Sequence, residues 1–220
     1  MAFNYEKDSQ NIVTITMDMD GRSANVINDE FSNLWVEVME RLENEKKLAG
    51  VIIASAKKTF LAGGDLEMIM ALDDPEKAFN LVEKLKFDLR RIEKLGKPVV
   101  AAINGAALGG GLEIALCCNY RIAVNSLKRI IGFPEVTLGI LPTAGGLIRT
   151  TRLIGLEVAL PFLLDGKQVA PSLAKNLGII DDMADNIKEL FSKAKHYILS
   201  NPEKLQPWDT KDYKMPGGNA

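Results

Sequence analysis

Two short, continuously apolar runs constrain the fold most, because each has the length of a buried strand and neither alternates with polar residues. The first is Gly50–Ala54 and the second is Pro98–Ile103. Strands that are apolar on both faces are typical of parallel sheets covered by helices. Between and before them, apolar residues recur at helical spacing after Asn28 and after Pro75. This alternation of strands and helices predicts an α/β fold.

Shorter patterns predict further elements. Ile12–Met17 alternates and is β-branched, and Tyr120–Val124 is another apolar run, so we expect both to be strands. The long helix from Pro75 should end before Gly96. We expect its buried face to consist of Ala78, Phe79, Val82, Leu85, Leu89 and Ile92. Other helices are expected over residues 144–154, 157–164 and 185–199.

Composition excludes several classes of protein. With 220 residues, 47% hydrophobic and 25% charged, the chain suits a soluble globular protein with one main domain. A net charge of −2 gives no general attraction to nucleic acid or to an anionic membrane. The N-terminus lacks the apolar core of a signal peptide, and no apolar run approaches the length of a membrane span. We therefore expect a cytoplasmic protein with neither nucleic acid nor membrane as a partner.

Histidine and cysteine usage narrows the chemistry. His196 is the only histidine, which argues against multi-histidine zinc sites and against the serine–histidine hydrolase triad. Cys117 and Cys118 are adjacent in an apolar run, so we expect reduced core residues rather than a disulfide. The alternative to a structural role is that one of them is a catalytic cysteine, but no histidine motif lies near either residue.

Two glutamates lie in glycine-rich, apolar surroundings. Glu113 follows Gly109-Gly110-Gly111, and Glu135 precedes Ala144-Gly145-Gly146. An ionised carboxylate is costly in such surroundings. Paired carboxylates beside backbone N–H groups exposed by glycine suit acid/base chemistry at a developing oxyanion. Tight packing of a strand on a helix would by itself explain the run Gly109-Gly110-Gly111. A second glycine turn, Gly63-Gly64, also precedes an expected helix.

Three segments, in this order, closely resemble the crotonase superfamily, and within it the enoyl-CoA hydratases. They are Phe60–Leu66, Ala102–Glu113 and Phe133–Pro142, the last followed by Ala144-Gly145-Gly146. The resemblance extends from the first strand to the helix ending near Leu199. It implies an α/β fold built as a crotonase-like spiral of ββα units, with acyl-CoA thioesters as substrates.

The resemblance also implies roles for individual residues. The backbone N–H groups of Gly64 and Gly110 would form the oxyanion hole for the thioester oxygen. Glu113 would position and deprotonate the attacking water, and Glu135 would exchange the proton at the α-carbon. No metal or redox cofactor is expected, since CoA enters as part of the substrate. The other expected substrate-binding residues are Lys58 at a CoA phosphate, Ala62 with its carbonyl facing the adenine, Asp65, Leu66 and Thr143.

The chain departs from the family pattern in three places. The separation of Glu113 and Glu135 is slightly long, with the extra residues expected in a surface insertion over residues 125–129. Thr143 stands where a glycine is common, and Leu147-Ile148 stands where Thr-Gln is common. Because these residues are expected to line or support the acyl pocket, the acyl length stays open.

We expect residues 1–200 to form the crotonase-like domain and residues 201–220 to form a tail or linker. This last segment resembles the one that follows the hydratase region in multifunctional fatty-oxidation proteins. Stand-alone hydratases usually carry further C-terminal helices that help to build trimers, so a homotrimer stays open.

The function expected from the resemblance is hydration of 2-enoyl-CoA to 3-hydroxyacyl-CoA in fatty acid β-oxidation. The nearest alternative is Δ3–Δ2 enoyl-CoA isomerisation, for which the family needs only the carboxylate at the position of Glu135. A non-catalytic acyl-CoA-binding domain is an alternative of another class.

Overall fold

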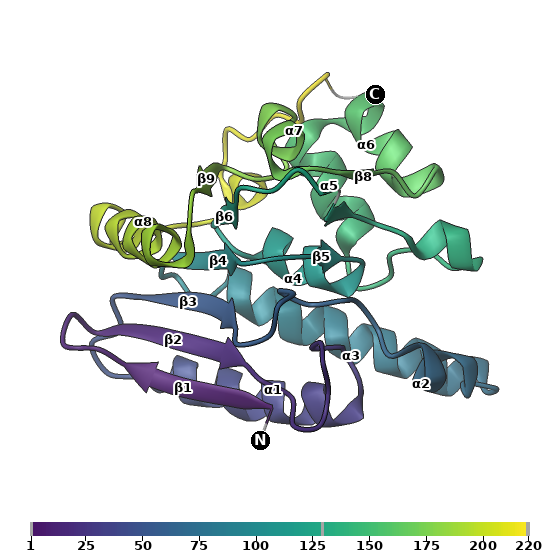
Figure 1. Cartoon of the computed structure of the whole chain (residues 1–220), viewed down its shortest axis with the longest axis horizontal. Coiled ribbons are helices and arrows are strands. Elements are labelled where there is room, and N and C mark those ends of the chain that lie inside the picture. Colours follow the sequence, from purple (N-terminus) through teal and green to yellow (C-terminus); the bar gives the residue numbers. More distant parts are fainter. Residues whose placement is uncertain (1, 129, 219–220) are drawn as a thin grey trace.

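The computed structural model of the chain describes residues 2–128 and 130–218, and a six-stranded sheet runs through it (Figure 1). The order of its strands is β1 (Phe3–Lys7), β2 (Ile12–Met17), β3 (Gly50–Ser55), β4 (Val99–Ile103), β6 (Tyr120–Val124) and β9 (Asp182–Ala184). Only β1 is antiparallel to its neighbour, β2, and every other neighbouring pair is parallel. The parallel interior explains why the runs that became β3 and β4 are apolar throughout.

A smaller three-stranded sheet leads into the region of the two glutamates. It contains β5 (Ala107–Leu108), β7 (Ile131–Gly132) and β8 (Gln168–Val169), in that order. β5 is parallel to β7, which is antiparallel to β8. Gly109 follows β5 directly and donates its N–H to the carbonyl of Gly132 in β7, at 3.0 Å. The chain segments that precede Glu113 and Glu135 are therefore held together.

The helices within the described residues surround these sheets. They are α1 (Asp29–Glu43), α2 (Leu66–Met70), α3 (Pro75–Glu93), α4 (Gly110–Cys117), α5 (Gly146–Ile154), α6 (Leu156–Leu164), α7 (Pro171–Asn176) and α8 (Ile187–Ser200), with the 3-10 turns η1 (Glu135–Leu138) and η2 (Pro207–Asp209). Asn28 caps α1 by accepting a hydrogen bond from the Phe31 N–H, and Asp74 caps α3. None of them combines the length and apolar character needed to cross a bilayer.

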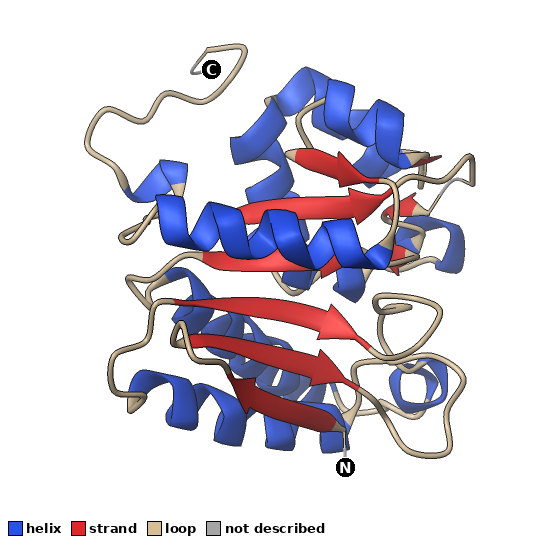
Figure 2. Cartoon of the chain, turned by 60° about the vertical axis from the view of Figure 1, so that its left-hand side comes forward, coloured by secondary structure: helices blue, strands red, loops and turns tan. Residues whose placement is uncertain are grey.

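The large sheet separates two apolar clusters. On one face α8 lies across the strands (Figure 2), and Ala194 and Ile198 pack with Ile52 and Val100. The other face belongs to the larger core, in which Phe31 and Trp35 of α1 stack with ring centroids 5.8 Å apart. The predicted strands at 12–17, 50–54, 98–103 and 120–124 are confirmed, as are the long helices.

The predicted buried face of α3 is wrong over the first half of the helix. Leu89 and Ile92 are buried, but the side chain of Phe79 is 63% exposed. The first half of α3 extends past the ends of the sheet strands (Figure 1), so there is no sheet for it to cover. Val82 and Leu85 instead form part of a cavity wall.

The segment that follows α8 lies against the body of the protein. Gln206 is buried and donates its side-chain amide to the carbonyl of Cys117, at 2.6 Å. The Tyr213 hydroxyl donates to the carbonyl of Arg152, at 2.6 Å. Residues 219 and 220 of the expected tail lie outside the described residues, as does Arg129 of the expected insertion, in which Leu127 is fully exposed.

Candidate active site

A cavity of about 410 Å³ brings the three sequence motifs together. Glu113, Glu135, Gly64 and Gly110 all line it. Most of the remaining wall is apolar and comes from α2, the first half of α3 and the segment after η1. The apolar residues that line the cavity are Ile27, Ala62, Leu66, Met68, Ile69, Leu72, Ala78, Leu81, Val82, Leu85, Pro134, Leu138, Ile140, Leu141 and Ala144. The site is therefore a polar end with two carboxylates joined to an apolar chamber.

Glu113 lies in the first turn of α4, where the helix begins directly after the glycine run. Its side chain is buried, and Oε1 accepts a hydrogen bond from the Gly146 N–H at 2.7 Å. The pKa of Glu113 is raised to about 7, mainly by burial and in smaller part by the negative charge of Glu135. The hydrogen bond from Gly146 and the positive charge of Arg149 act in the opposite direction.

Glu135 begins η1, immediately after Pro134. Its side chain is buried, and Oε2 has no hydrogen-bond partner among the described residues. Burial raises the pKa of this carboxyl group to about 7. An unpartnered buried carboxylate oxygen is costly, and protonation or a ligand removes that cost. Glu135 is therefore suited to hold or transfer a proton in the cavity.

Glycine is required where the backbone passes the two carboxylates. Gly109 has a φ of +54°, and a Cβ at this position would lie 2.7 Å from Oε1 of Glu135. A Cβ on Gly146 would lie 2.9 Å from Oε1 of Glu113. Side chains at either position would push the glutamates away from the places they occupy.

Two backbone N–H groups come from different glycine turns. A parallel bridge joins Gly64 to Ile27: the Ile27 N–H donates to the Gly63 carbonyl at 2.8 Å, and the Asp65 N–H donates to the Ile27 carbonyl at 2.9 Å. This pattern turns the N–H of Gly64 away from Ile27. The N–H of Gly110, at the first residue of α4, has no carbonyl within the helix to bind. Among the described residues neither N–H donates to a carbonyl outside its own helix or strand, and both glycines line the cavity.

The two turns are also close in space. A Cβ on Gly63 would lie 3.8 Å from the nitrogen of Gly110 and 3.4 Å from the carbonyl oxygen of Leu108. The convergence of the two turns, which spacing along the sequence left open, is therefore present in the fold.

The other expected substrate-binding residues divide into two groups. Ala62, Leu66 and Thr143 line the cavity. Lys58 is exposed and is not part of the wall, while Asp65 caps α2 and pairs with Arg22 at 2.7 Å. Of the substituted Leu147-Ile148 pair, neither residue lines the cavity: Leu147 packs against the core, and Ile148 is exposed.

Sequence reasoning missed a buried ion pair behind Glu113. Arg149 Nε lies 2.8 Å from Oε1 of Glu93, and both side chains are buried. The position of Glu93 carried a signal, because it lies four residues after Leu89 and so on the buried face of α3. Arg149 lies three residues into α5, where an arginine facing the core has no obvious sequence signal.

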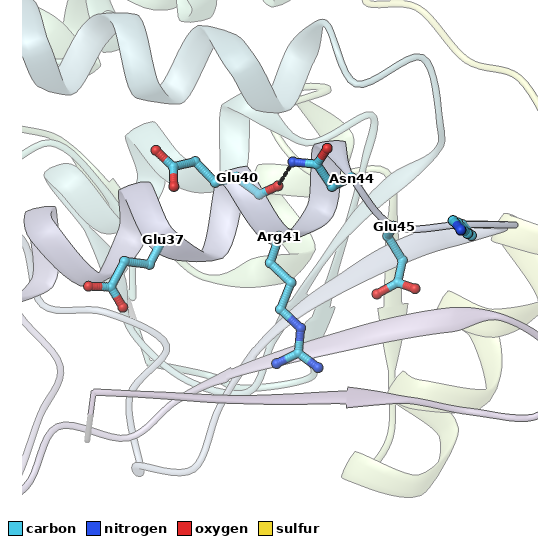
Figure 3. Close-up of a pocket in the computed structure, with 6 residues that line it drawn as sticks. Glu37, Glu40, Arg41, Asn44 and Glu45 are labelled. Carbon is cyan, nitrogen blue, oxygen red and sulfur yellow. Dashed lines mark hydrogen bonds between the residues drawn. The ribbon is translucent and has the colours of Figure 1, made fainter.

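A second depression lies beside the last turns of α1 (Figure 3), away from the glycine motifs. Glu37, Glu40, Arg41, Asn44, Glu45 and Lys46 line it. Arg41 lies 3.6 Å from the ring centroid of Tyr5, and Glu45 accepts hydrogen bonds from Tyr5 and Lys7. These contacts join the end of α1 and the residues after it to β1, so the side chains that line the depression have a structural role.

Comparisons with known proteins agree with the geometry. The family model for enoyl-CoA hydratase/isomerase matches residues 7–202. The chain is 37% identical over 186 residues to the fatty acid oxidation complex subunit alpha of Shewanella frigidimarina, covering 84% of this chain and 26% of that protein. For the Idiomarina loihiensis protein of the same name the identity is 36% over 207 residues, covering 94% of this chain and 29% of the relative. The chain thus spans little more than a quarter of these relatives.

Solved structures of shorter proteins match most of both chains. The enoyl-CoA hydratase of Bacillus anthracis superposes with a TM-score of 0.82 at 29% identity, covering 91% of this chain and 76% of that one. The enoyl-CoA hydratase of Thermoplasma volcanium gives a TM-score of 0.82 at 28% identity, covering 90% and 77%. The fold expected from the three motifs is confirmed. The chain belongs to the enoyl-CoA hydratase/isomerase family and has its crotonase fold.

Proposed function

We propose that the chain adds water to 2-enoyl-CoA thioesters to give 3-hydroxyacyl-CoA, as a step of fatty acid β-oxidation. The observation that carries this proposal is the pair of buried glutamates, Glu113 and Glu135, in one cavity with the N–H groups of Gly64 and Gly110. Family membership and the names of the relatives support the same reaction. The apolar wall formed by α2 and α3 suits an acyl chain.

In the proposed mechanism, the thioester oxygen accepts hydrogen bonds from the Gly64 and Gly110 N–H groups. Water adds to C3 of the enoyl group only when negative charge can develop on that oxygen. Fixed donors in a site that excludes water stabilise this charge, and losing one such donor typically lowers turnover by about 10²–10³-fold. We assign the oxyanion hole to these two N–H groups.

The two glutamates divide the proton transfers in this proposal. Ionised Glu113 takes a proton from water as the oxygen bonds to C3, and protonated Glu135 gives its proton to C2. Because both carboxyl groups have a pKa near 7, the pair holds about one proton at neutral pH. Transfer of the proton from Glu113 back to Glu135 restores the starting state. Hydration involves no net electron transfer, so the proposal includes no redox cofactor. It includes no metal, because the two N–H groups stabilise the charge on the thioester oxygen.

The proposal includes acyl-CoA as the binding partner and a cytosolic location, which the two buried free thiols of Cys117 and Cys118 support. A homotrimer rests on the family resemblance alone, and sedimentation velocity would test it. Contacts of Lys58 and Ala62 with the CoA moiety are part of the same proposal.

The test is the loss of enoyl-thioester absorbance with crotonyl-CoA and with longer 2-enoyl-CoAs. The parent chain should hydrate at least one of them, and the Glu113→Gln and Glu135→Gln variants should each lose most turnover while still binding acyl-CoA. Acyl-CoA binding by the parent without any loss of absorbance would overturn the proposal and favour a binding domain.

One observation favours isomerisation as a second activity. Oε2 of Glu135 is buried and unpartnered among the described residues, so Glu135 has an oxygen free to move a proton between C2 and C4 of a 3-enoyl-CoA. Glu113→Gln should then abolish hydration and spare the conversion of 3-enoyl-CoA to 2-enoyl-CoA. If Glu113→Gln lost both activities equally, the hypothesis that Glu135 alone catalyses isomerisation would be wrong.

A further inference from the structure

The buried pair of Glu93 and Arg149 lies directly behind the turn that holds Glu113. Arg149 binds Glu93 with two atoms, Nε to Oε1 at 2.8 Å and Nη2 to Oε2 at 3.1 Å. Its remaining terminal nitrogen, Nη1, donates to the carbonyl of Ala144 at 2.9 Å. The guanidinium group is thus fixed by a carboxylate on one side and uses its free end to hold the backbone.

The turn held by Arg149 is the one that binds Glu113. Ala144, whose carbonyl accepts from Arg149, is two residues before Gly146, whose N–H donates to Glu113 Oε1 at 2.7 Å. Gly145 lies between them with a φ of +102°, and a Cβ there would lie 2.1 Å from Nη1 of Arg149. The turn is therefore wrapped closely on the guanidinium group, and moving one moves the other.

We propose that Glu93 and Arg149 are positioning residues for Glu113: the pair fixes the turn 144–146, and the turn fixes the carboxylate. This inference rests on the proposed function for its kinetic consequence. Neither residue lines the cavity, so neither touches the substrate.

Glu93 is itself held from a second side. Arg90 Nη1 donates to Glu93 Oε2 at 2.6 Å, and the other end of Arg90 binds Asp209 in the C-terminal segment. Lys94 also pairs with Asp209, at 3.2 Å. The turn 144–146 is therefore connected through Arg149, Glu93 and Arg90 to Asp209 in η2.

The charge of Arg149 adds to its geometric role. The charged groups that act on Glu113 are Glu135 from η1 and Arg149 from α5, while Glu93 of α3 balances the charge of Arg149. Glu113 in turn raises the pKa of Cys117 in α4. Arg149 lowers the pKa of Glu113, against the larger effect of burial. Losing the pair removes both this charge and the firm hydrogen bond from Gly146, so the pKa of Glu113 should rise.

The first test is the double variant Glu93→Leu/Arg149→Met, which removes both buried charges and so avoids leaving one unpaired. We expect kcat for 2-enoyl-CoA hydration to fall by about 10²-fold, as for a displaced catalytic group. KM should change by less than about threefold, because the acyl-CoA contacts are intact. The acid limb of the kcat–pH profile should move to higher pH.

The matched control is Arg121→Met/Asp181→Leu. Arg121 is also a buried arginine that binds a carboxylate, Asp181 at 2.8 Å, and a backbone carbonyl, Cys118 at 2.8 Å, but that carbonyl lies outside the turn 144–146. This variant should lose stability and keep the kcat and the pH profile of the parent. A loss of kcat equal to that of the first variant would show a general effect of instability and overturn the proposal.

Arg149→Lys separates geometry from charge and serves if the double variant does not fold. Lysine keeps the positive charge but cannot bind Glu93 at two points and Ala144 at the same time. We expect kcat between those of the parent and the double variant, with the acid limb close to that of the parent. A kcat equal to that of the parent would overturn the positioning role.

A measurement without turnover distinguishes this inference from the proposed function. The pKa of Glu113, followed by carboxyl ¹³C NMR, should rise in Glu93→Leu/Arg149→Met and stay unchanged in the control pair. If the parent hydrates no enoyl-CoA, the proposed function fails, while this pKa still tests the positioning role. An unchanged pKa in the double variant would overturn it.

Discussion

Glu113 makes the stability of the protein depend on pH in an unusual direction. Its pKa is about 7 in the folded chain and 4.5 in the absence of burial. Between these values the folded chain binds more protons than the unfolded chain, so the free energy of unfolding decreases as pH rises from about 4.5 to 7. Above pH 7 both states are ionised, and this contribution becomes constant.

Glu113→Gln should therefore stabilise the protein at high pH. Glutamine stays neutral, so we expect a gain of about 3 kcal/mol at pH 8 and of less than about 1 kcal/mol at pH 5. Urea unfolding at the two pH values measures both. Glu203→Gln, at an exposed position, is the control and should change stability by less than about 0.5 kcal/mol. A gain that is equal at both pH values would contradict the assignment of the raised pKa to Glu113.

Gly109→Ala should inactivate the protein by displacing Glu135. The new Cβ would lie 2.7 Å from Oε1 of Glu135, so we expect a loss of hydration of about 10²-fold or more. Gly96→Ala is the matched control, because Gly96 also has a positive φ, +70°, but a Cβ there meets nothing within 4 Å. It should lose about 1 kcal/mol of stability and keep its turnover. Similar kcat values for the two variants would contradict the displacement of Glu135 by the new Cβ.

At the scale of elements, Asn25 joins the ends of two strands to the first glycine turn. Its buried side chain accepts from the Met19 N–H and donates to the Met17 carbonyl and the Ser55 hydroxyl, all within 3.1 Å. Its own carbonyl accepts from the Ala62 N–H at 2.9 Å. The Ala62–Gly64 turn is therefore anchored to the ends of β2 and β3.

Asn25→Ala should destabilise the protein by about 2–4 kcal/mol, because it removes several buried hydrogen bonds and leaves the N–H of Met19 without its partner. Urea denaturation measures the change. Asn4→Ala removes an exposed side chain that donates a hydrogen bond to Glu6, and it should cost less than about 0.5 kcal/mol. If the two alanine variants were equally stable, the network around Asn25 would carry no net stability.

The elements that the sequence predicted are those with a pattern of their own. β2, β3, β4, β6 and the long helices α1, α3 and α8 show either a continuous apolar run or a regular apolar spacing over five residues or more. The strands of the small sheet, β5, β7 and β8, have two residues each, too few for any period, and they exist because they pair with one another. β1 carries Glu6 and Lys7 on an exposed edge, so its pattern is mostly polar.

The same distinction applies to the cavity. Glycine runs and glutamates in apolar surroundings could be found from the sequence because their composition is unusual. The wall formed by Leu81, Val82 and Leu85 could not, because a stripe of apolar residues on a helix gives no sign of whether it faces a core or a chamber. The contact of Arg149 with Glu93 depends on how α5 is placed against α3, 56 residues earlier in the chain, which no local pattern contains.

At the scale of the whole molecule, the C-terminal segment takes part in the fold through Gln206. Its amide satisfies the carbonyl of Cys117 in a fully buried position. Gln206→Ala should cost about 1–3 kcal/mol, because that carbonyl is then left unpaired. The midpoint of thermal unfolding measures the effect. Lys204→Ala, two residues earlier and exposed, should leave the midpoint unchanged. A similar midpoint for both variants would show that this segment adds no stability through Gln206.

The two halves of helix α3 contribute to different parts of the site. Val82 and Leu85 help to shape the apolar chamber, and Glu93 at the last turn anchors Arg149. A substitution that shifts this rigid helix to make room for a bulkier acyl group also moves the anchor of the Glu113 turn. Specificity and turnover should therefore co-vary across variants of α3, and an evolutionary path toward a new chain length would need a compensating change near Arg149 to recover speed.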